Sequence, residues 1–374
     1  MKLNFRLMRI YFYFTIGLLL ISFTFNSCKE EVELVGKFKE TAVIYGLLDQ
    51  SESTHFIKIN RAFIGPGNAL EIAKIPDSSY FSSVDATITE YLNNYKTGKS
   101  WILKDTVINT KNTNGVFYAP TEKLYYFDDT SLGGLNPNAI YKLEIIIYKG
   151  TNKEFIVTGE TGLVNGITSG QSSQNAAFDF INNSDGKLKA TNVSVSNTGN
   201  ASVINASIKI EFDEYQNSTI VNPVSIIWNT GESEVQSNST FSTSIEGQIF
   251  YDLIKTNTTS NPIITKRKLK TMTIILTGGS EEFNNYINTN KPSTSLAQTK
   301  PNYTNLKISN DNYVIGIFSS RQTVSIVKPF SISLQNSSCL SQKSRQELCE
   351  GVTTYGLLFC SDNNFDANKS FYCN

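Results

Sequence analysis

Histidine is almost missing from this sequence, and so are the compact motifs of common hydrolases. The 374 residues include one histidine, His55, which excludes a multi-histidine metal centre and the His-Glu-x-x-His motif of zinc proteases. No Gly-x-Ser-x-Gly segment is present to hold a serine nucleophile on a strained turn. We therefore expect His55 to be structural and the protein to be no enzyme, with no catalytic residue, no metal and no cofactor.

An excess of one charge sign is also lacking. Lysine and arginine number 33, as do aspartate and glutamate, so the basic face of a nucleic-acid binder is not expected. Of the adjacent acidic pairs, Asp128-Asp129 would point to opposite faces of a strand, and Glu281-Glu282 would complement a helix dipole. Neither pair predicts the facing carboxylates of a glycosidase. Asp77 with Asp128 and Asp129 is a weaker calcium hypothesis, because EF-hand spacing is absent.

The first thirty residues have the three-part order of a bacterial signal peptide. Basic residues precede an apolar run at 10–25, and the small Ser27 stands directly before Cys28. We expect residues 1–27 to be a lipoprotein signal peptide and Cys28 to carry acyl chains such as palmitate, which anchor the protein in a membrane. The alternatives are an uncleaved transmembrane anchor or a secretory leader with an incidental cysteine.

A short charged segment follows this cysteine. Residues 29–33 read Lys-Glu-Glu-Val-Glu, which resembles the signal that sends lipoproteins of Bacteroidota-type bacteria to the outer face of the outer membrane. We expect residues 28–40 to be a tether and the protein to face the cell exterior. The alternative is an ordinary solvated tether without a sorting role.

The remaining cysteines lie at the end of the chain. Cys339, Cys349, Cys360 and Cys373 fall within 339–374, and four cysteines in an oxidising compartment predict two disulfides. Three pairings are open. A four-thiolate zinc site is the alternative, but no close Cys-x-x-Cys pair is present. We expect a disulfide-stapled, Cys-rich C-terminal tail.

Apolar residues elsewhere recur with a period of two in short runs between turn residues, which is typical of strands. In 141–148, for example, every second residue is apolar. We expect an all-β protein of two immunoglobulin-like or related β-sandwich modules, one at 41–165 and a second β-rich domain at 201–338. A polar linker or irregular segment would join them at 166–200. One short helix is expected after the capping residue Ser280.

Several blocks of sequence carry a family resemblance. They are the leader and the segments 43–49, 55–63, 84–88, 298–305 and 316–321. Together they resemble an uncharacterised family of Bacteroidota outer-membrane lipoproteins, domain of unknown function 4249. The resemblance implies an outer-membrane lipoprotein that works beside a TonB-dependent transporter, and it supplies no catalytic residue. The tail departs from the family pattern.

These features together predict a surface-exposed lipoprotein that acts as a non-enzymatic binding or accessory subunit, beside a TonB-dependent transporter in nutrient uptake. The ligand is not predicted. The alternatives are a structural or adhesive envelope protein and a glycan or ester hydrolase.

Asp105-Thr106-Val107 resembles the O-glycosylation acceptor of Bacteroidota, so Thr106 is a candidate modification site. The alternative is an ordinary strand-edge triplet. Aromatic clusters such as Tyr125-Tyr126-Phe127 could supply a stacking platform for sugars, but most aromatic side chains are expected in the core. Alternation places Tyr126 on the opposite face from its neighbours, and no residue of the cluster stands out as a binding site.

Overall fold

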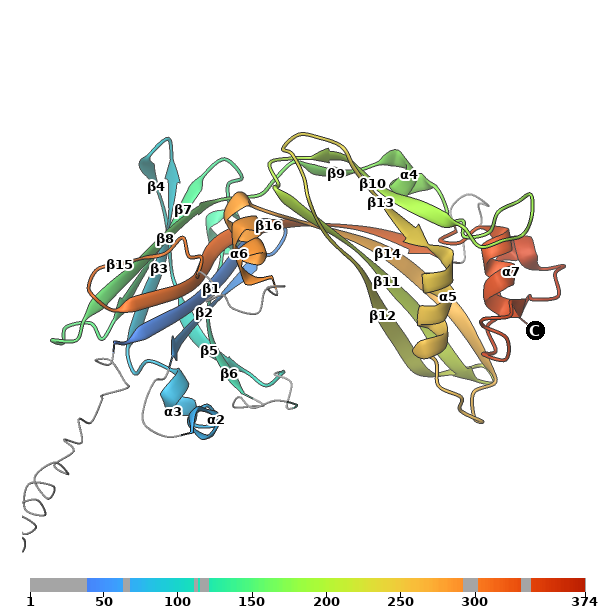
Figure 1. Cartoon of the computed structure of the whole chain (residues 1–374), viewed down its shortest axis with the longest axis horizontal. Coiled ribbons are helices and arrows are strands. Elements are labelled where there is room, and N and C mark those ends of the chain that lie inside the picture. Colours follow the sequence, from blue (N-terminus) through green and yellow to red (C-terminus); the bar gives the residue numbers. More distant parts are fainter. Residues whose placement is uncertain are drawn as a thin grey trace, which may run out of the picture. The chain divides into compact units, whose positions relative to one another are not determined.

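The computed structural model describes residues 39–62, 68–110, 114, 121–291, 302–330 and 338–373. The expected signal peptide, Cys28 and most of the tether lie outside these residues. The described part is mostly β (Figure 1), as the alternating pattern predicts. Its strands are β1 (Thr41–Asp49), β2 (Thr54–Ala62), β3 (Val84–Leu92), β4 (Tyr95–Ile102), β5 (Lys104–Ile108), β6 (Glu122–Asp128), β7 (Ile140–Ile147), β8 (Phe155–Gly162), β9 (Ile167–Ser169), β10 (Ala190–Thr198), β11 (Val203–Gln216), β12 (Thr219–Glu234), β13 (Phe241–Glu246), β14 (Lys266–Gly279), β15 (Lys307–Ile308) and β16 (Tyr313–Pro329).

These strands form an eight-stranded, a five-stranded and a three-stranded sheet within the described residues. The strand orders are β12-β11-β14-β16-β1-β2-β6-β5, β15-β8-β7-β3-β4 and β13-β10-β9. Helices are short and lie between strands or in the tail. They are α2 (Ala69–Ile72), α3 (Pro76–Ser79), α4 (Gln171–Asn175), α5 (Gly247–Thr256), α6 (Glu281–Asn290) and α7 (Gln342–Glu350), with 3-10 turns η2 (Thr130–Leu132) and η4 (Asn364–Asp366).

A first hydrophobic core lies between the five-stranded sheet and the β1-β2-β6 part of the large sheet. On β7, Tyr141, Leu143, Ile145 and Ile147 are each at most 1% exposed. Their alternation with exposed or half-buried neighbours confirms the expected inward face of this strand. Since each large apolar side chain contributes about 1.5–3 kcal/mol when fully buried, this face is a main source of stability.

The hydroxyl of Tyr141 joins this core to the loop before β7. It accepts a hydrogen bond from the backbone N–H of Asn136 at 2.6 Å and donates one to Glu90 Oε2 at 2.8 Å. Burial, followed by the bond to Glu90, raises the pKa of Tyr141, so the phenol stays protonated and can donate. A tyrosine hydroxyl bonded to the backbone a few residues upstream has the form of a tyrosine corner. Trp101 packs beside it, with ring centroids 6.2 Å apart.

A second hydrophobic core gathers β10, β11, β13, β14 and α5. Phe180 stacks on Phe250 with centroids 4.9 Å apart, and both side chains are fully buried. Phe180 falls in 166–200, the segment expected to be a polar linker or irregular. That segment instead contains β9, α4 and β10. Polar residues of this segment form hydrogen bonds with one another. For example, the Ser173 hydroxyl accepts a hydrogen bond from the backbone N–H of Ser194 at 2.7 Å.

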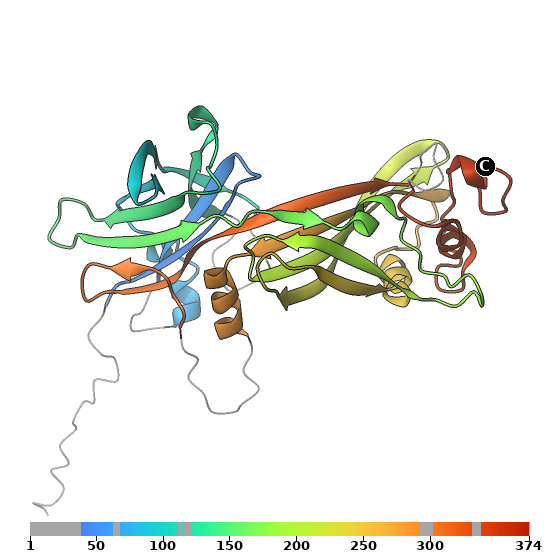
Figure 2. The ribbon, with the colours of Figure 1, turned by 90° about the horizontal axis from the view of Figure 1, so that it is seen from above.

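Strand β16 contributes to both cores (Figure 2). Residues 313–321 pair in parallel with β1, and residues 321–329 pair antiparallel with β14. Phe318 is buried in the first core, and Val324 and Ile326 pack on the second. Phe318 and Leu306 lie in the expected second domain, 201–338, yet they complete the first core. The expected domain boundary differs from the observed cores because pairing between distant strands is not encoded in the local sequence pattern.

Helix α6 begins where the sequence predicts. The Ser280 hydroxyl accepts a hydrogen bond from the Phe283 N–H, and Glu281 and Glu282 occupy the first turn. Helices α5 and α7 were not expected. Glu246, the residue before α5, makes no capping hydrogen bond with its side chain. The start of that helix therefore has no capping residue that could be recognised in the sequence. Helix α7 does have a capping serine, Ser341, but it lies within the expected Cys-rich tail.

The described part of the tail, residues 339–373, is folded against the second core. Leu340, Leu348 and Phe359 are buried there. Arg345, 1% exposed, donates from Nε and Nη2 to the two oxygens of Asp366 at 2.6 and 3.0 Å. Burial opposes ionisation of Asp366, but the hydrogen bonds from Arg345 and its neighbours outweigh it and hold the pKa of Asp366 below its usual range. This bidentate pair fixes helix α7 to the end of the chain.

Tyr141→Phe tests the tyrosine corner. The change leaves the Glu90 carboxylate, which is 1% exposed, without its phenol donor. We expect the free energy of unfolding to fall by about 1–3 kcal/mol, the cost of a lost buried hydrogen bond. Urea denaturation provides the measurement. Tyr95→Phe, at a side chain 78% exposed, is the matched control and should have little effect; equal stability of both variants would contradict a stabilising role for the corner.

Candidate functional site

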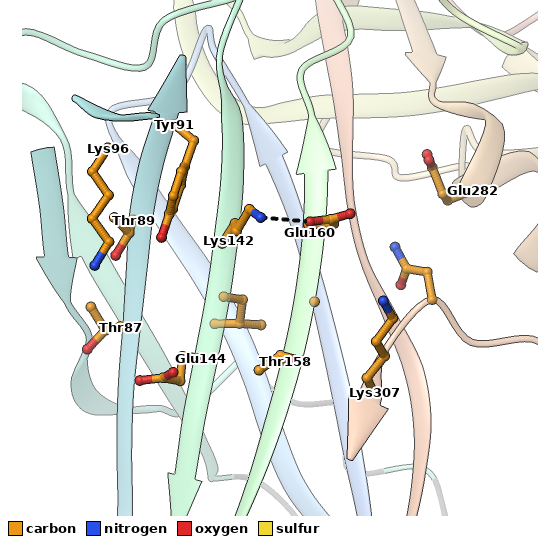
Figure 3. Close-up of a pocket in the computed structure, with 13 residues that line it drawn as sticks. Thr87, Thr89, Tyr91, Lys96, Lys142, Glu144, Thr158, Glu160, Glu282 and Lys307 are labelled. Atoms are coloured by element: carbon orange, nitrogen blue, oxygen red, sulfur yellow. Dashed lines mark ion pairs between the residues drawn. The ribbon is translucent and has the colours of Figure 1, made fainter. Parts of the chain in front are cut away.

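A groove crosses the outer face of the five-stranded sheet, on the side away from the first core. It has a volume of about 520 Å³ and is formed by β3, β4, β7 and β8, together with the residues around β15 and the start of α6 (Figure 3). Most of its lining residues are polar or charged. The lining residues are Thr87, Thr89, Tyr91, Lys96, Lys142, Leu143, Glu144, Thr158, Gly159, Glu160, Glu282, Asn305 and Lys307.

Strand alternation positions most of these side chains. On β3, Ala86 and Ile88 are buried in the first core, so Thr87, Thr89 and Tyr91 project to the opposite, outer face. The same alternation on β7 and β8 places their lysine and glutamate side chains beside them in Figure 3. The apolar inner face that stabilises the module therefore determines which residues line the groove.

Lys142 is at the centre of the groove. Its Nζ lies 3.3 Å from Glu160 Oε2 and 4.8 Å from the centroid of the Tyr91 ring. The ammonium therefore covers the Tyr91 ring and holds the adjacent Glu160 carboxylate in a cation–π and ion-pair arrangement. Both charged side chains are about half exposed, so the ion pair is screened by water and is open to exchange with a ligand.

Further charges line the same groove without being paired. Lys96, Lys307 and Glu144 form no ion pair with any other residue in the described ranges. Glu282 reaches the groove from the first turn of α6, where it accepts a hydrogen bond from the Ser280 hydroxyl at 2.6 Å. The groove thus offers both charge signs and several hydroxyl groups to a ligand.

A smaller hollow of about 210 Å³ continues the groove toward the β3–β4 hairpin. It shares Tyr91, Lys142, Glu160 and Glu282 with the main groove and adds Asn94 and Ile140. Ile140 is 42% exposed, so the extension offers an apolar contact next to the charged centre. An extended ligand with polar and apolar parts fits this combination better than a single ion does.

His55 is not in the groove. It is 1% exposed, its Nε2 lies 3.1 Å from Asp129 Oδ2, and its ring stacks on Phe127 with centroids 4.7 Å apart. Its Nδ1 has no hydrogen-bond partner among the described residues, so no nucleophile is aligned with it there. The histidine is a buried side chain packed against Phe127 of the first core, which agrees with the structural role expected for it.

The acidic and aromatic candidates occupy separate places. Asp128 is exposed, and hydrogen bonds from the Thr130 hydroxyl and N–H hold its pKa below its usual range, while its neighbour Asp129 points inward to His55. Within the described residues, no group of three or more His, Cys, Asp or Glu side chains is arranged to hold a metal. Asp77, Asp128 and Asp129 are therefore not brought together as such a group in the described residues.

The alternation predicted for the aromatic run is confirmed. Tyr125 and Phe127 are at most 5% exposed, whereas Tyr126 lies on the other face with its ring centroid 6.0 Å from that of Phe56. Thr106 is half-buried on β5, an edge strand of the large sheet. Its O-glycosylation stays a prediction.

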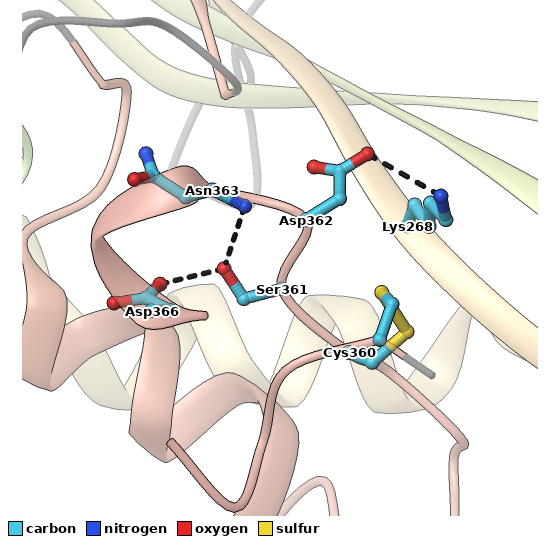
Figure 4. The surroundings of a disulfide bond; sticks show 7 residues. Lys268, Cys360, Ser361, Asp362, Asn363 and Asp366 are labelled. Carbon is cyan, nitrogen blue, oxygen red and sulfur yellow. Dashed lines mark hydrogen bonds and ion pairs between the residues drawn. A yellow bond between two sulfur atoms is a disulfide. The ribbon is translucent and has the colours of Figure 1, made fainter. Parts of the chain in front are cut away.

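The cysteines of the tail form one of the two expected disulfides among the described residues. Cys360 is bonded to Cys373, and Cys339 and Cys349 are free. Burial raises the pKa of both free thiols to about 12, so they stay protonated and unreactive at neutral pH. Around the disulfide, the Ser361 hydroxyl donates to Asp366 at 2.6 Å and Lys268 pairs with Asp362 at 3.5 Å (Figure 4). The disulfide therefore rules out a zinc site built from all four thiolates.

Comparison with known proteins adds no family to this picture. No protein-family model matches the sequence, and no curated protein shows significant similarity to it. The resemblance to domain of unknown function 4249 therefore stays a prediction. Among the described helices, none is long and apolar enough to span a membrane.

Thiol counting tests the cysteine arrangement. The chain beginning at residue 29, folded in oxidising buffer and then denatured without reductant, should release two reactive thiols, those of Cys339 and Cys349. In the folded protein Cys339 should be protected, because it is 0% exposed. Labelling followed by peptide mapping identifies the residues. Finding no free thiol would show that both predicted disulfides form and that the structure lacks one.

Proposed function

We propose that this protein is a lipid-anchored outer-membrane lipoprotein that faces the cell exterior and binds a ligand without chemically changing it. The groove across β3, β7 and β8 carries the binding part of the proposal, because it combines charge of both signs with an adjoining apolar hollow. The signal-peptide pattern of residues 1–27 and Cys28 supports the anchor. Membrane attachment through acyl chains leaves the folded chain free to face its ligand.

The groove favours a charged peptide over a neutral sugar. Sugar platforms offer the open face of an aromatic ring, whereas the Tyr91 ring is covered by the Lys142 ammonium at 4.8 Å. The unpaired Lys96, Lys307 and Glu144 suit the termini and charged side chains of a short peptide. The hydroxyl groups of Thr87, Thr89 and Thr158 add hydrogen bonds that fix its orientation.

In this proposal the first core belongs to an immunoglobulin-like β-sandwich. Its support is the tyrosine corner of Tyr141 and the buried Trp101, both of which accompany such sandwiches. The second β-rich part would be a related module. The protein would deliver its ligand to a TonB-dependent transporter, as the family resemblance implies.

An adhesive or structural role in the envelope is the second candidate, and the tail favours it. Val352 and Tyr355 are 94% and 81% exposed, so this loop presents apolar surface that a partner protein would cover. The double variant Val352→Ser with Tyr355→Ser removes this apolar surface. Under the adhesive role it would impair envelope assembly, whereas under the leading proposal it would leave peptide binding intact.

Peptide binding tests the groove directly. A panel of short peptides of varied charge is titrated against the native chain and against Lys142→Gln with Glu160→Gln, using calorimetry. We expect the double variant to bind at least about tenfold more weakly, which corresponds to the loss of about 1.4 kcal/mol of charged contacts.

A matched control uses an ion pair away from the groove. Lys209 and Glu211 form a pair of 2.6 Å on β11 and are about one-third exposed. Lys209→Gln with Glu211→Gln should bind peptides as the native chain does. Equal loss in both double variants, or no binding by the native chain to any peptide in the panel, would reject the groove as a peptide site.

Lipid labelling in the source bacterium tests the anchor. The native protein should incorporate labelled fatty acid and be removed from intact cells by protease, because Cys28 would be acylated and displayed outside. Cys28→Ala should incorporate no label. A native protein that is labelled but protected from protease would face the periplasm, and an unlabelled native protein would refute the lipoprotein assignment.

A further inference from the structure

The second core and its tail contain three buried cations, and only two of them have a carboxylate partner among the described residues. Arg267 and Arg345 are 2% and 1% exposed. Arg267 pairs with Glu214 at 2.7 Å and Arg345 pairs with Asp366 at 2.6 Å. Lys328, near the end of β16, is 5% exposed. Burying a charge without a counter-charge costs free energy of folding, and Lys328 has no carboxylate partner among the described residues.

The ammonium of Lys328 is held by neutral groups. It donates to the backbone carbonyls of Gln174 at 3.3 Å and Ala176 at 2.6 Å, and it lies 5.7 Å from the centroid of the Phe178 ring. Burial lowers the pKa of Lys328. These contacts orient the ammonium and supply partial negative charge, but none of them neutralises it.

The ionisable group that interacts with Lys328, the Cys339 thiol, cannot serve as the counter-charge. Cys339 interacts electrostatically with Lys328, but burial raises the pKa of this thiol to about 12. The thiol is therefore neutral at physiological pH. The segments between 39 and 373 that lie outside the described residues contain no aspartate or glutamate, so they add no carboxylate that could pair with the ammonium.

Lys328 lines a cavity with no acidic residue in its wall. The cavity has a volume of about 360 Å³, which is within the range of small-molecule sites. Its other lining residues are small or neutral, and the side chains of Thr191 and Asn192 add a hydroxyl and an amide. These residues are Ser173, Ala176, Ala177, Phe178, Ala190, Thr191 and Asn192.

We propose that this cavity binds a small oxyanion, a carboxylate or phosphate group, whose negative charge pairs with the Lys328 ammonium. The two carbonyls hold the ammonium in place, and Thr191 and Asn192 can donate hydrogen bonds to the oxyanion. The site is separate from the groove of the five-stranded sheet and does not depend on the function proposed for that groove.

Calorimetric melting of the full chain in mild detergent tests the site, with sodium phosphate and sodium succinate compared against sodium chloride at equal ionic strength. The melting temperature should rise with phosphate, with succinate or with both, following the logarithm of concentration above the dissociation constant. A response to one anion alone identifies which oxyanion group is bound. Lys328→Met should abolish the rise. Lys343→Met, which removes an exposed lysine of helix α7, should preserve it.

No rise with either anion in the native chain, or the same rise in Lys328→Met, would overturn the proposal. A second measurement covers the case in which Lys328→Met does not fold. NMR of the native chain with ¹³C-methylated lysines should show one lysine with a lowered pKa that rises when the active anion is added. If no lysine signal behaves in this way, the proposal fails by this route as well.

Discussion

The pairing of β16 with β1 on one side and β14 on the other is the constraint on which the rest of the structure depends. The backbone of Gly316, at φ +105°, lies so close to β1 that a Cβ would be 1.9 Å from the Ile44 carbonyl oxygen. This close approach seats Phe318 in the first core. A Cβ on Gly159 of β8 would in turn lie 3.1 Å from Phe318 Cβ, so the sheet that forms the groove rests directly on β16.

Features that follow from local pattern could be predicted from the sequence, and features that follow from long-range pairing could not. The inward face of β7 and the start of α6 at Ser280 are encoded within a few residues. The parallel partner of β1 is not encoded locally, because that strand, β16, begins only at Tyr313. For the same reason the contact of Phe180 with Phe250 in the second core could not be predicted from the serine- and asparagine-rich stretch that contains Phe180.

The candidate sites show the same division. Single residues with unusual chemistry are visible in the sequence, but they do not form the groove. His55 is buried against Asp129, as expected of a structural histidine, and two of the four tail cysteines are unbonded. The groove is instead built from common residues such as Lys142 and Glu160. In the sequence these are ordinary outward-facing strand residues, and only the pairing of β7 with β8 brings them together. Lys328 was equally inconspicuous, since only its burial distinguishes it from other lysines.

The parallel pairing of β1 with β16 also bears on the order in which the protein folds. A chain synthesised from its N-terminus delivers Thr41 long before Tyr313, its partner across the sheet. Until then β1 is paired with β2 on one side only, and its other edge has no strand partner. Such non-local contacts slow folding and expose strand edges to aggregation. The open edge of β1 is therefore the place where a partly synthesised chain is exposed to wrong strand pairing until its last strands arrive.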